Sequence, residues 1–130
     1  MKLHHSGFIV KNIDEYQSKM IFEEKLIDLI DPIQNARLCL YSNYTDAFIE
    51  LIQPLNENAF TWKSLQKFGN HFEHFCYLVS SKEEMEMIVT QFRLIRIKEP
   101  LPAIIFDNKL VSFYYNHNKQ IVEFLINSFN

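Results

Sequence analysis

The stretch HSGFIV (His5–Val10) decides the fold, because the chain repeats its pattern as HFCYLV (His74–Val79). Each copy is a run of β-branched and aromatic residues led by a histidine, which predicts a strand. A longer segment, NARLCLYSNYTDAFIELI from Asn35, recurs as NKLVSFYYNHNKQIVEFL from Asn108. Histidines, asparagines and glutamates match together with the apolar positions, so chance similarity of two strand-rich halves explains this poorly. The sequence is therefore an internal duplication.

Each copy predicts a strand, a helix and three further strands. Asn12 and Ser81 are candidate helix caps, each followed by helical apolar spacing. The predicted fold class is α+β: two paired βαβββ modules that form a curved, half-barrel mixed sheet around a cleft. A single domain at 1–130 is expected, with module 1 at about 1–54 and module 2 at about 71–130. The linker at 55–70 contains a predicted short helix that carries three apolar side chains to the core: Phe60, Leu65 and Phe68.

The composition limits the classes of partner. The 130 residues are 48% hydrophobic, with a net charge of -3 and no cluster of basic residues. This predicts a globular protein that binds neither nucleic acid nor membrane. Cys39 and Cys76 lie in apolar runs, and neither a signal peptide nor a membrane span is recognisable, so we expect reduced, buried thiols and a cytoplasmic location. The two glycines exclude a phosphate-binding glycine loop.

Two carboxylates and two histidines stand out within these strands. Glu50 and Glu123 lie in strands that are apolar on both faces, where an uncompensated carboxylate costs several kcal/mol. His5 and His74 lead the first strand of each module, with a small residue two positions later that leaves room before each ring. Two imidazoles and two carboxylates form a ligand set suited to Zn²⁺, Ni²⁺, Co²⁺, Mn²⁺ or Fe²⁺. A single strand histidine or glutamate is more often a hydrogen-bonded core or edge residue, and the duplication of all four favours the metal.

Strand alternation also predicts what lines the cavity. We expect Tyr41 and Tyr114 to face it, together with the small residues Cys39 and Ser112. The large apolar neighbours are expected under the helices instead: Leu38, Leu40, Val111 and Phe113. The three other histidines are expected to face solvent: His4, His71 and His117.

Nearly the whole chain resembles the vicinal oxygen chelate (glyoxalase/bleomycin-resistance) superfamily. The resemblance is carried by HHSGFIVKNIDEY, DPIQNARLCLY, FIELIQPLNENA, HFEHFCYLVSSKEEM and IVEFLIN, and it is closest to the branch of methylmalonyl-CoA epimerase-like and lactoylglutathione lyase-like proteins. It implies that His5, Glu50, His74 and Glu123 bind one divalent metal ion. It also implies a substrate with two neighbouring oxygens and an enolate stabilised by the metal. In that chemistry Glu123 is the expected catalytic base, with Glu50 as its partner on the opposite face.

The sequence also departs from the epimerases it resembles. Ile33 precedes Gln34, where they have an additional acid beside the glutamine, and no arginine pair for glutathione is evident. Gln34 is still a candidate substrate contact, together with three aromatic side chains: Tyr41, Phe48 and Tyr114.

Three functions therefore stay open. The first is a metal-dependent isomerase or lyase acting on a small acyl or 2-oxo substrate, such as a thioester. The second is an Fe²⁺ extradiol-type dioxygenase, and the third is a protein that sequesters a small aromatic compound without catalysis. The sequence leaves open whether the modules pair within one chain or between two chains of a homodimer, and the apolar face of FTWKSLQKF, which contains Trp62, supports a partner surface.

Overall fold

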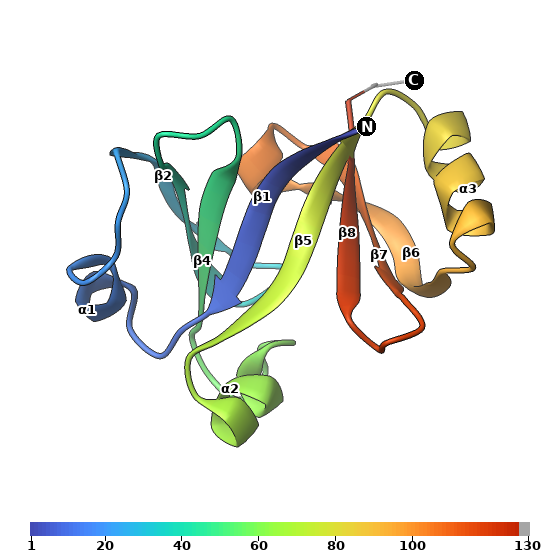
Figure 1. The fold of residues 1–130 in the computed structure, drawn as a ribbon. Helices are drawn as coiled ribbons and strands as arrows, with labels where there is room; N and C mark the ends of the chain where they lie inside the picture. Colours follow the sequence, from blue (N-terminus) through green and yellow to red (C-terminus); the bar gives the residue numbers. More distant parts are fainter. Residues whose placement is uncertain (128–130) are drawn as a thin grey trace. The chain divides into compact units, whose positions relative to one another are not determined.

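The computed structural model describes residues 1–127 and contains both βαβββ modules in the predicted order (Figure 1). The first module consists of β1 (Lys2–Ile9), α1 (Ile13–Gln17), β2 (Glu24–Asp31), β3 (Ala36–Ser42) and β4 (Phe48–Pro54). The linker carries α2 (Trp62–Phe68). The second module consists of β5 (His71–Val79), α3 (Lys82–Gln91), β6 (Ile95–Ala103), the short 3-10 helix η1 (Ile104–Phe106), β7 (Lys109–Tyr115) and β8 (Ile121–Ile126).

The strands are hydrogen-bonded in the orders β2-β3-β4-β1 and β5-β8-β7-β6, each of which combines parallel with antiparallel pairs. This mixed sheet confirms the predicted α+β fold class. The chain divides into two compact units, which we describe one at a time. The N-unit comprises His5–Glu73, and the C-unit comprises the residues from His74 onward together with Met1–His4.

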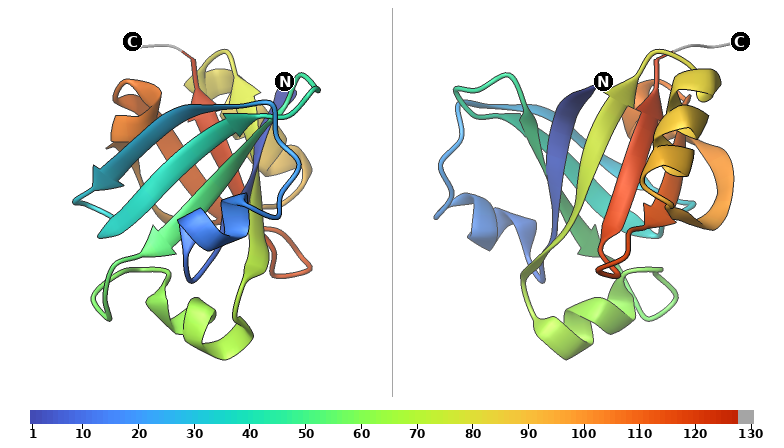
Figure 2. Two further views of the ribbon diagram at one scale, coloured as in Figure 1. Left: turned by 90° about the vertical axis from the view of Figure 1, so that its left-hand side faces the viewer. Right: turned by 45° about the vertical axis from the view of Figure 1, so that its right-hand side comes forward.

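In the N-unit, β1 pairs in parallel with β4, and β2, β3 and β4 form an antiparallel meander (Figure 2, left). The helix α1 begins as predicted, because the Asn12 side chain accepts a hydrogen bond from the Glu15 backbone N–H. The core on this helix side includes Val10, Ile13 and Tyr41. Phe22 covers Tyr41, with a ring-centroid distance of 4.9 Å.

The C-unit repeats this plan with a longer helix. Its β5 pairs in parallel with β8, while β6, β7 and β8 are antiparallel neighbours. Ser81 caps α3 by accepting from the Glu84 backbone N–H, as predicted. The helix lies beside β8 (Figure 2, right), where Met85 is buried with Tyr114 and Phe124.

The linker helix was predicted only in part. Leu65 is buried, as expected, but Phe60 and Phe68 are each 60% exposed. A helix of seven residues has two turns and presents few positions to one face, so it buries only part of its apolar set. None of the described helices is long and apolar enough to span a membrane.

Candidate functional site

The N-unit places His5 and Glu50 together on one face of its sheet. Gly7 of β1 stands directly beside Glu50 of β4, and His5 stands beside Phe48. His5 is fully buried, Glu50 is 5% exposed, and His5 Nε2 lies 3.5 Å from Glu50 Oε1. Because Gly7 has no side chain, nothing on β1 covers the carboxylate at that position.

The C-unit repeats this arrangement at the matching positions. Cys76 of β5 stands beside Glu123 of β8, and His74 stands beside Ile121. His74 is 2% exposed and Glu123 4%, and His74 Nε2 lies 3.0 Å from Glu123 Oε1. Each unit by itself therefore buries one imidazole nitrogen against one carboxylate.

The strand register corrects the predicted lining of this face. Leu40 pairs with Glu50 and Phe113 pairs with Glu123, so both apolar side chains share the face of the carboxylates and do not lie under the helices. The Phe113 ring meets the His74 ring edge-on at 6.3 Å, and Lys98 Nζ lies 5.2 Å from the Phe113 centroid. Lys98 was not singled out from the sequence, so this contact with Phe113 was missed.

Tyr41 and Tyr114 are consequently wrong as cavity-lining residues. Tyr41 pairs with Ile49 and Tyr114 with Val122, on the faces that the helices cover. The Tyr41 hydroxyl donates to Gln17 Oε1 at 2.8 Å, and burial raises the pKa of that hydroxyl. The prediction failed because alternation was counted along each strand alone, whereas the pairing with the neighbouring strand sets the face. Cys39 and Ser112 lie two positions before these tyrosines on the same strands, so they share the helix side with them.

The other two predicted substrate contacts lie on the N-unit. Phe48 stands beside His5 and is half-buried, so it shares the face of the histidine. Gln34 lies in the turn between β2 and β3, where its Nε2 donates to Asp31 Oδ2 at 3.1 Å. The side chain of Gln34 is therefore held by its own turn.

An ion-pair cluster on the helix side of the N-unit was also missed. Arg37 Nε and Nη2 donate to the two carboxylate oxygens of Asp28 at 2.9 and 2.7 Å, and Nη1 donates to Asp14 Oδ1 at 3.1 Å. Hydrogen bonding to Arg37 lowers the pKa of Asp28 far below its usual range and raises the pKa of the guanidinium. Burial raises the pKa of the Cys39 thiol to about 11, so this thiol stays protonated at neutral pH. Arg37 ties α1 to the sheet.

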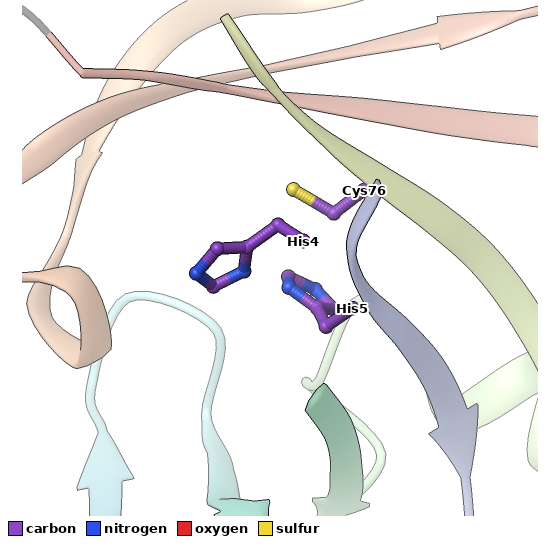
Figure 3. Close-up of side chains that lie close together, drawn as sticks. All are labelled: His4, His5 and Cys76. Atoms are coloured by element: carbon purple, nitrogen blue, oxygen red, sulfur yellow. The ribbon is translucent and has the colours of Figure 1, made fainter. Parts of the chain in front are cut away.

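Two of the three remaining histidines are less exposed than expected. His4 is half-buried in the C-unit, with its ring edge-on to Phe106 at 5.3 Å. One of its ring nitrogens lies within 4.8 Å of the Cys76 sulfur; Figure 3 draws both side chains with His5, the next residue in the chain. His71 is partly buried and its Nδ1 bonds the Gly69 carbonyl at 2.7 Å, while His117 is exposed, as predicted.

Solved structures provide the comparison with known proteins. A hypothetical protein from Bacillus halodurans aligns with a TM-score of 0.83 at 25% identity, over 99% of this chain and 96% of its own. Methylmalonyl-CoA epimerase from Mycobacterium tuberculosis aligns at 0.82 and 20% identity, over 98% and 88%. A variant of the Streptomyces coelicolor epimerase, in complex with 2-nitronate-propionyl-CoA, aligns at 0.79 and 15% identity, over 97% and 96%.

No protein-family model and no curated protein matches the chain. The structural neighbours nevertheless span nearly the whole chain at high TM-scores. The chain therefore has the fold of the vicinal oxygen chelate superfamily, as its sequence resemblance implied.

Proposed function

We propose that this protein is a metal-dependent isomerase that moves the proton next to the carbonyl group of a small acyl thioester. The observation that carries the proposal is the buried histidine–glutamate pair, which occurs in each unit at the same strand register: His5 with Glu50, and His74 with Glu123. Burying a carboxylate lowers the stability of the fold unless a cation or a proton compensates its charge. Its occurrence at matched positions in both units therefore indicates a functional role.

The donor set fits a divalent metal ion. Each pair offers a histidine Nε2 and a carboxylate oxygen, 3.5 and 3.0 Å apart, among residues that are at most 5% exposed. We propose that His5, Glu50, His74 and Glu123 hold one ion together, a mixture of ligands that suits Zn²⁺, Ni²⁺, Co²⁺, Mn²⁺ or Fe²⁺. When bound, such an ion supplies Lewis-acid stabilisation of the charge that develops on the carbonyl oxygen of the substrate.

The residues of the chain have distinct parts in this reaction. A carboxylate oxygen of Glu123 takes the proton from the substrate carbon, and Glu50 returns one from the opposite side. His74 holds Glu123 in position through its 3.0 Å contact. The apolar neighbours Leu40 and Phe113, which pair with the two glutamates, keep water from the carbon during the transfer.

The substrate class rests on the structural neighbours. Several of them are methylmalonyl-CoA epimerases, one in complex with methylmalonyl-CoA and NH4+. This chain has Ile33 before Gln34, where the epimerases it resembles have an additional acid. We therefore propose an acyl thioester of related size without committing to methylmalonyl-CoA as the natural substrate. The expected homodimer and the cytoplasmic location stay predictions.

Metal analysis and solvent-proton exchange test the proposal together. Protein purified without chelators is expected to contain about one equivalent of a divalent metal, which both His5→Ala and His74→Ala lose. In D₂O, the protein is expected to place deuterium next to the carbonyl of methylmalonyl-CoA or a related acyl-CoA. Glu86→Gln, which changes an exposed carboxylate on α3, is the matched control and keeps both properties.

Two other results would favour the alternative functions. Consumption of O₂ with a catechol and Fe²⁺ would identify a dioxygenase. A metal-free protein that binds a planar aromatic compound and exchanges no proton would identify a sequestering protein. Either result overturns the isomerase.

A further inference from the structure

A large groove opens on the N-unit, away from the strand face of His5 and Glu50. Its volume is about 1080 Å³. It is bounded by the segments that follow β1 and end β4, by α1 and by the linker helix α2. The residues that matter most for its chemistry are Lys11, Tyr16, Lys19, Gln53, Trp62 and Asn70.

The matching surface of the C-unit has no counterpart of the linker helix and serves as a comparison for the groove. Ser80 and Glu84 match Lys11 and Glu15 in the repeat, and they line a hollow of only about 280 Å³. There Glu84 turns back to accept hydrogen bonds from Ser80 N–H and Oγ, both at 3.2 Å. In the N-unit, Glu15 lies 3.8 Å from Lys19 instead, and α2 adds a wall that includes Trp62. The linker therefore makes a ligand-sized groove from a surface hollow.

The polar groups left in the groove are mainly hydrogen-bond donors. Asn70 Oδ1 accepts from the Lys11 backbone N–H, and Gln53 Oε1 accepts from the Ile13 N–H, each at 2.8 Å. Each amide oxygen already accepts one hydrogen bond, whereas both NH₂ groups, with two donors each, remain to bind a ligand. Within residues 1–127, Lys11 Nζ and Trp62 Nε1 have no hydrogen-bond or ion-pair partner. The Glu15 carboxylate is the acid of the groove, and Lys19 offsets its charge.

The remaining wall is apolar and partly aromatic. Tyr16 and Trp62 are half-buried, and Met20, Leu55 and Leu65 complete the lining. Aromatic and aliphatic walls accommodate a flat ring, whereas the amide and ammonium donors suit an acceptor-rich anion. We infer that the groove between α1 and α2 binds a nucleotide, with its phosphates near Lys11 and Lys19 and its base against Trp62.

Two sources offer this chemistry: a free nucleotide, or the nucleotide end of a coenzyme A thioester. The second source rests on the proposed function. It is sterically reasonable because the strands β1 and β4, which carry His5 and Glu50, lead directly to Lys11 and Gln53 at the groove.

Trp62 makes a direct test simple, since it is the one tryptophan in the chain. ADP and coenzyme A are titrated separately into the full-length protein, with tryptophan fluorescence and calorimetry as readouts and adenosine as the ligand without phosphate. We expect a saturable fluorescence change with ADP and at least about tenfold weaker binding of adenosine. Lys11→Ala is expected to weaken ADP binding about tenfold, whereas Lys63→Ala, on an exposed position of α2 outside the groove, leaves it unchanged.

The outcomes separate this site from the proposed reaction. ADP binding that survives in His5→Ala supports the groove even if no proton exchange is ever detected. Coenzyme A that binds more tightly than ADP, with both weakened by Lys11→Ala, identifies the thioester as the source. ADP that binds as tightly as coenzyme A or more tightly, and is weakened by Lys11→Ala, identifies a free nucleotide. Absence of saturable ADP binding, or equal losses in Lys11→Ala and Lys63→Ala, overturns the inference.

Discussion

The two units place a histidine–glutamate pair at the same register but surround it differently. In the N-unit, Glu50 lies between Gly7 of β1 and Leu40 of β3, so its strand neighbours are small or aliphatic. In the C-unit, Glu123 lies between Cys76 of β5 and Phe113 of β7. The duplication has therefore kept the donor pair while the adjacent side chains diverged. The two glutamates are chemically distinct and need not contribute equally to a reaction.

The helix sides of the two units differ in a second way. Arg37 ties α1 to the N-unit sheet through Asp28 and Asp14. The matching position in the C-unit is Leu110, which packs against the core beneath α3. A helix of five residues buries little apolar area, so ion pairs supplement it, whereas the ten residues of α3 dock mainly by apolar packing.

The largest expected effect divides the two glutamates. On the proposal that they serve opposite sides of one substrate, Glu123→Gln is expected to slow deuterium exchange of one enantiomer of the acyl thioester by roughly 10²- to 10⁴-fold. Glu50→Gln is expected to do the same to the other enantiomer. Exchange is followed by mass spectrometry on each enantiomer, with metal content measured in parallel.

The control is again Glu86→Gln, which is expected to exchange both enantiomers at the original rate. If both glutamate variants keep their metal yet lose the same enantiomer, one carboxylate does all the chemistry. The division of roles between the units would then be wrong, although the metal site would stand.

A smaller effect is expected from the Arg37 cluster. Arg37→Met removes a guanidinium that bonds both Asp28 oxygens, and it is expected to lower the free energy of unfolding by about 1 kcal/mol. The matched control is Arg96→Met in the C-unit, because Arg96 pairs with Glu99 on an exposed strand and its side chain is 50% exposed. This control is expected to change stability by less than about 0.5 kcal/mol. Urea unfolding measures both, and equal losses would contradict a special role for Arg37.

Much of this architecture was predictable, because duplication makes the signal of each element appear twice. The two helix caps and the order of elements along each module follow from matched segments, with caps at Asn12 and Ser81. The sequence did not predict which residues of β3 and β7 share the face of the glutamates. Apolar residues occupy both sides of these strands, so alternation cannot distinguish the two faces. Only pairing with β4 and β8 assigns Leu40 and Phe113 to the side of the glutamates. The ion-pair partners of Arg37 could not be predicted, because they lie on α1 and β2 and no local sequence pattern shows that these elements contact β3 at Arg37.

The Arg37 cluster also predicts a pH dependence. Arg37 holds the pKa of Asp28 well below its usual range, so folding favours the ionised carboxylate. The resulting stability is fully present above the unfolded pKa of about 4 and is lost as the pH falls toward the lower pKa of the folded state. The stability difference between the original protein and Asp28→Asn is therefore expected to stay constant from about pH 6 to 8 and to shrink below about pH 4. Urea unfolding at several pH values measures it, and a difference that grows on acidification would contradict the ion pair.

The smallest expected effect is that of Ser112→Ala. Ser112 matches Cys39 in the repeat, and both residues lie fully buried on the helix sides of β7 and β3. Ser112 Oγ has no hydrogen-bond partner among the described residues, so its desolvation is uncompensated. Ser112→Ala is expected to leave the free energy of unfolding unchanged or to raise it by up to about 1 kcal/mol. Cys39→Ser would place the same hydroxyl in the N-unit core and is expected to cost about 1 to 3 kcal/mol. Urea unfolding measures the stability of both variants. If Ser112→Ala destabilises the protein as much as Cys39→Ser does, the Ser112 hydroxyl has a hydrogen-bond partner in solution, and the expected difference between the two cores is wrong.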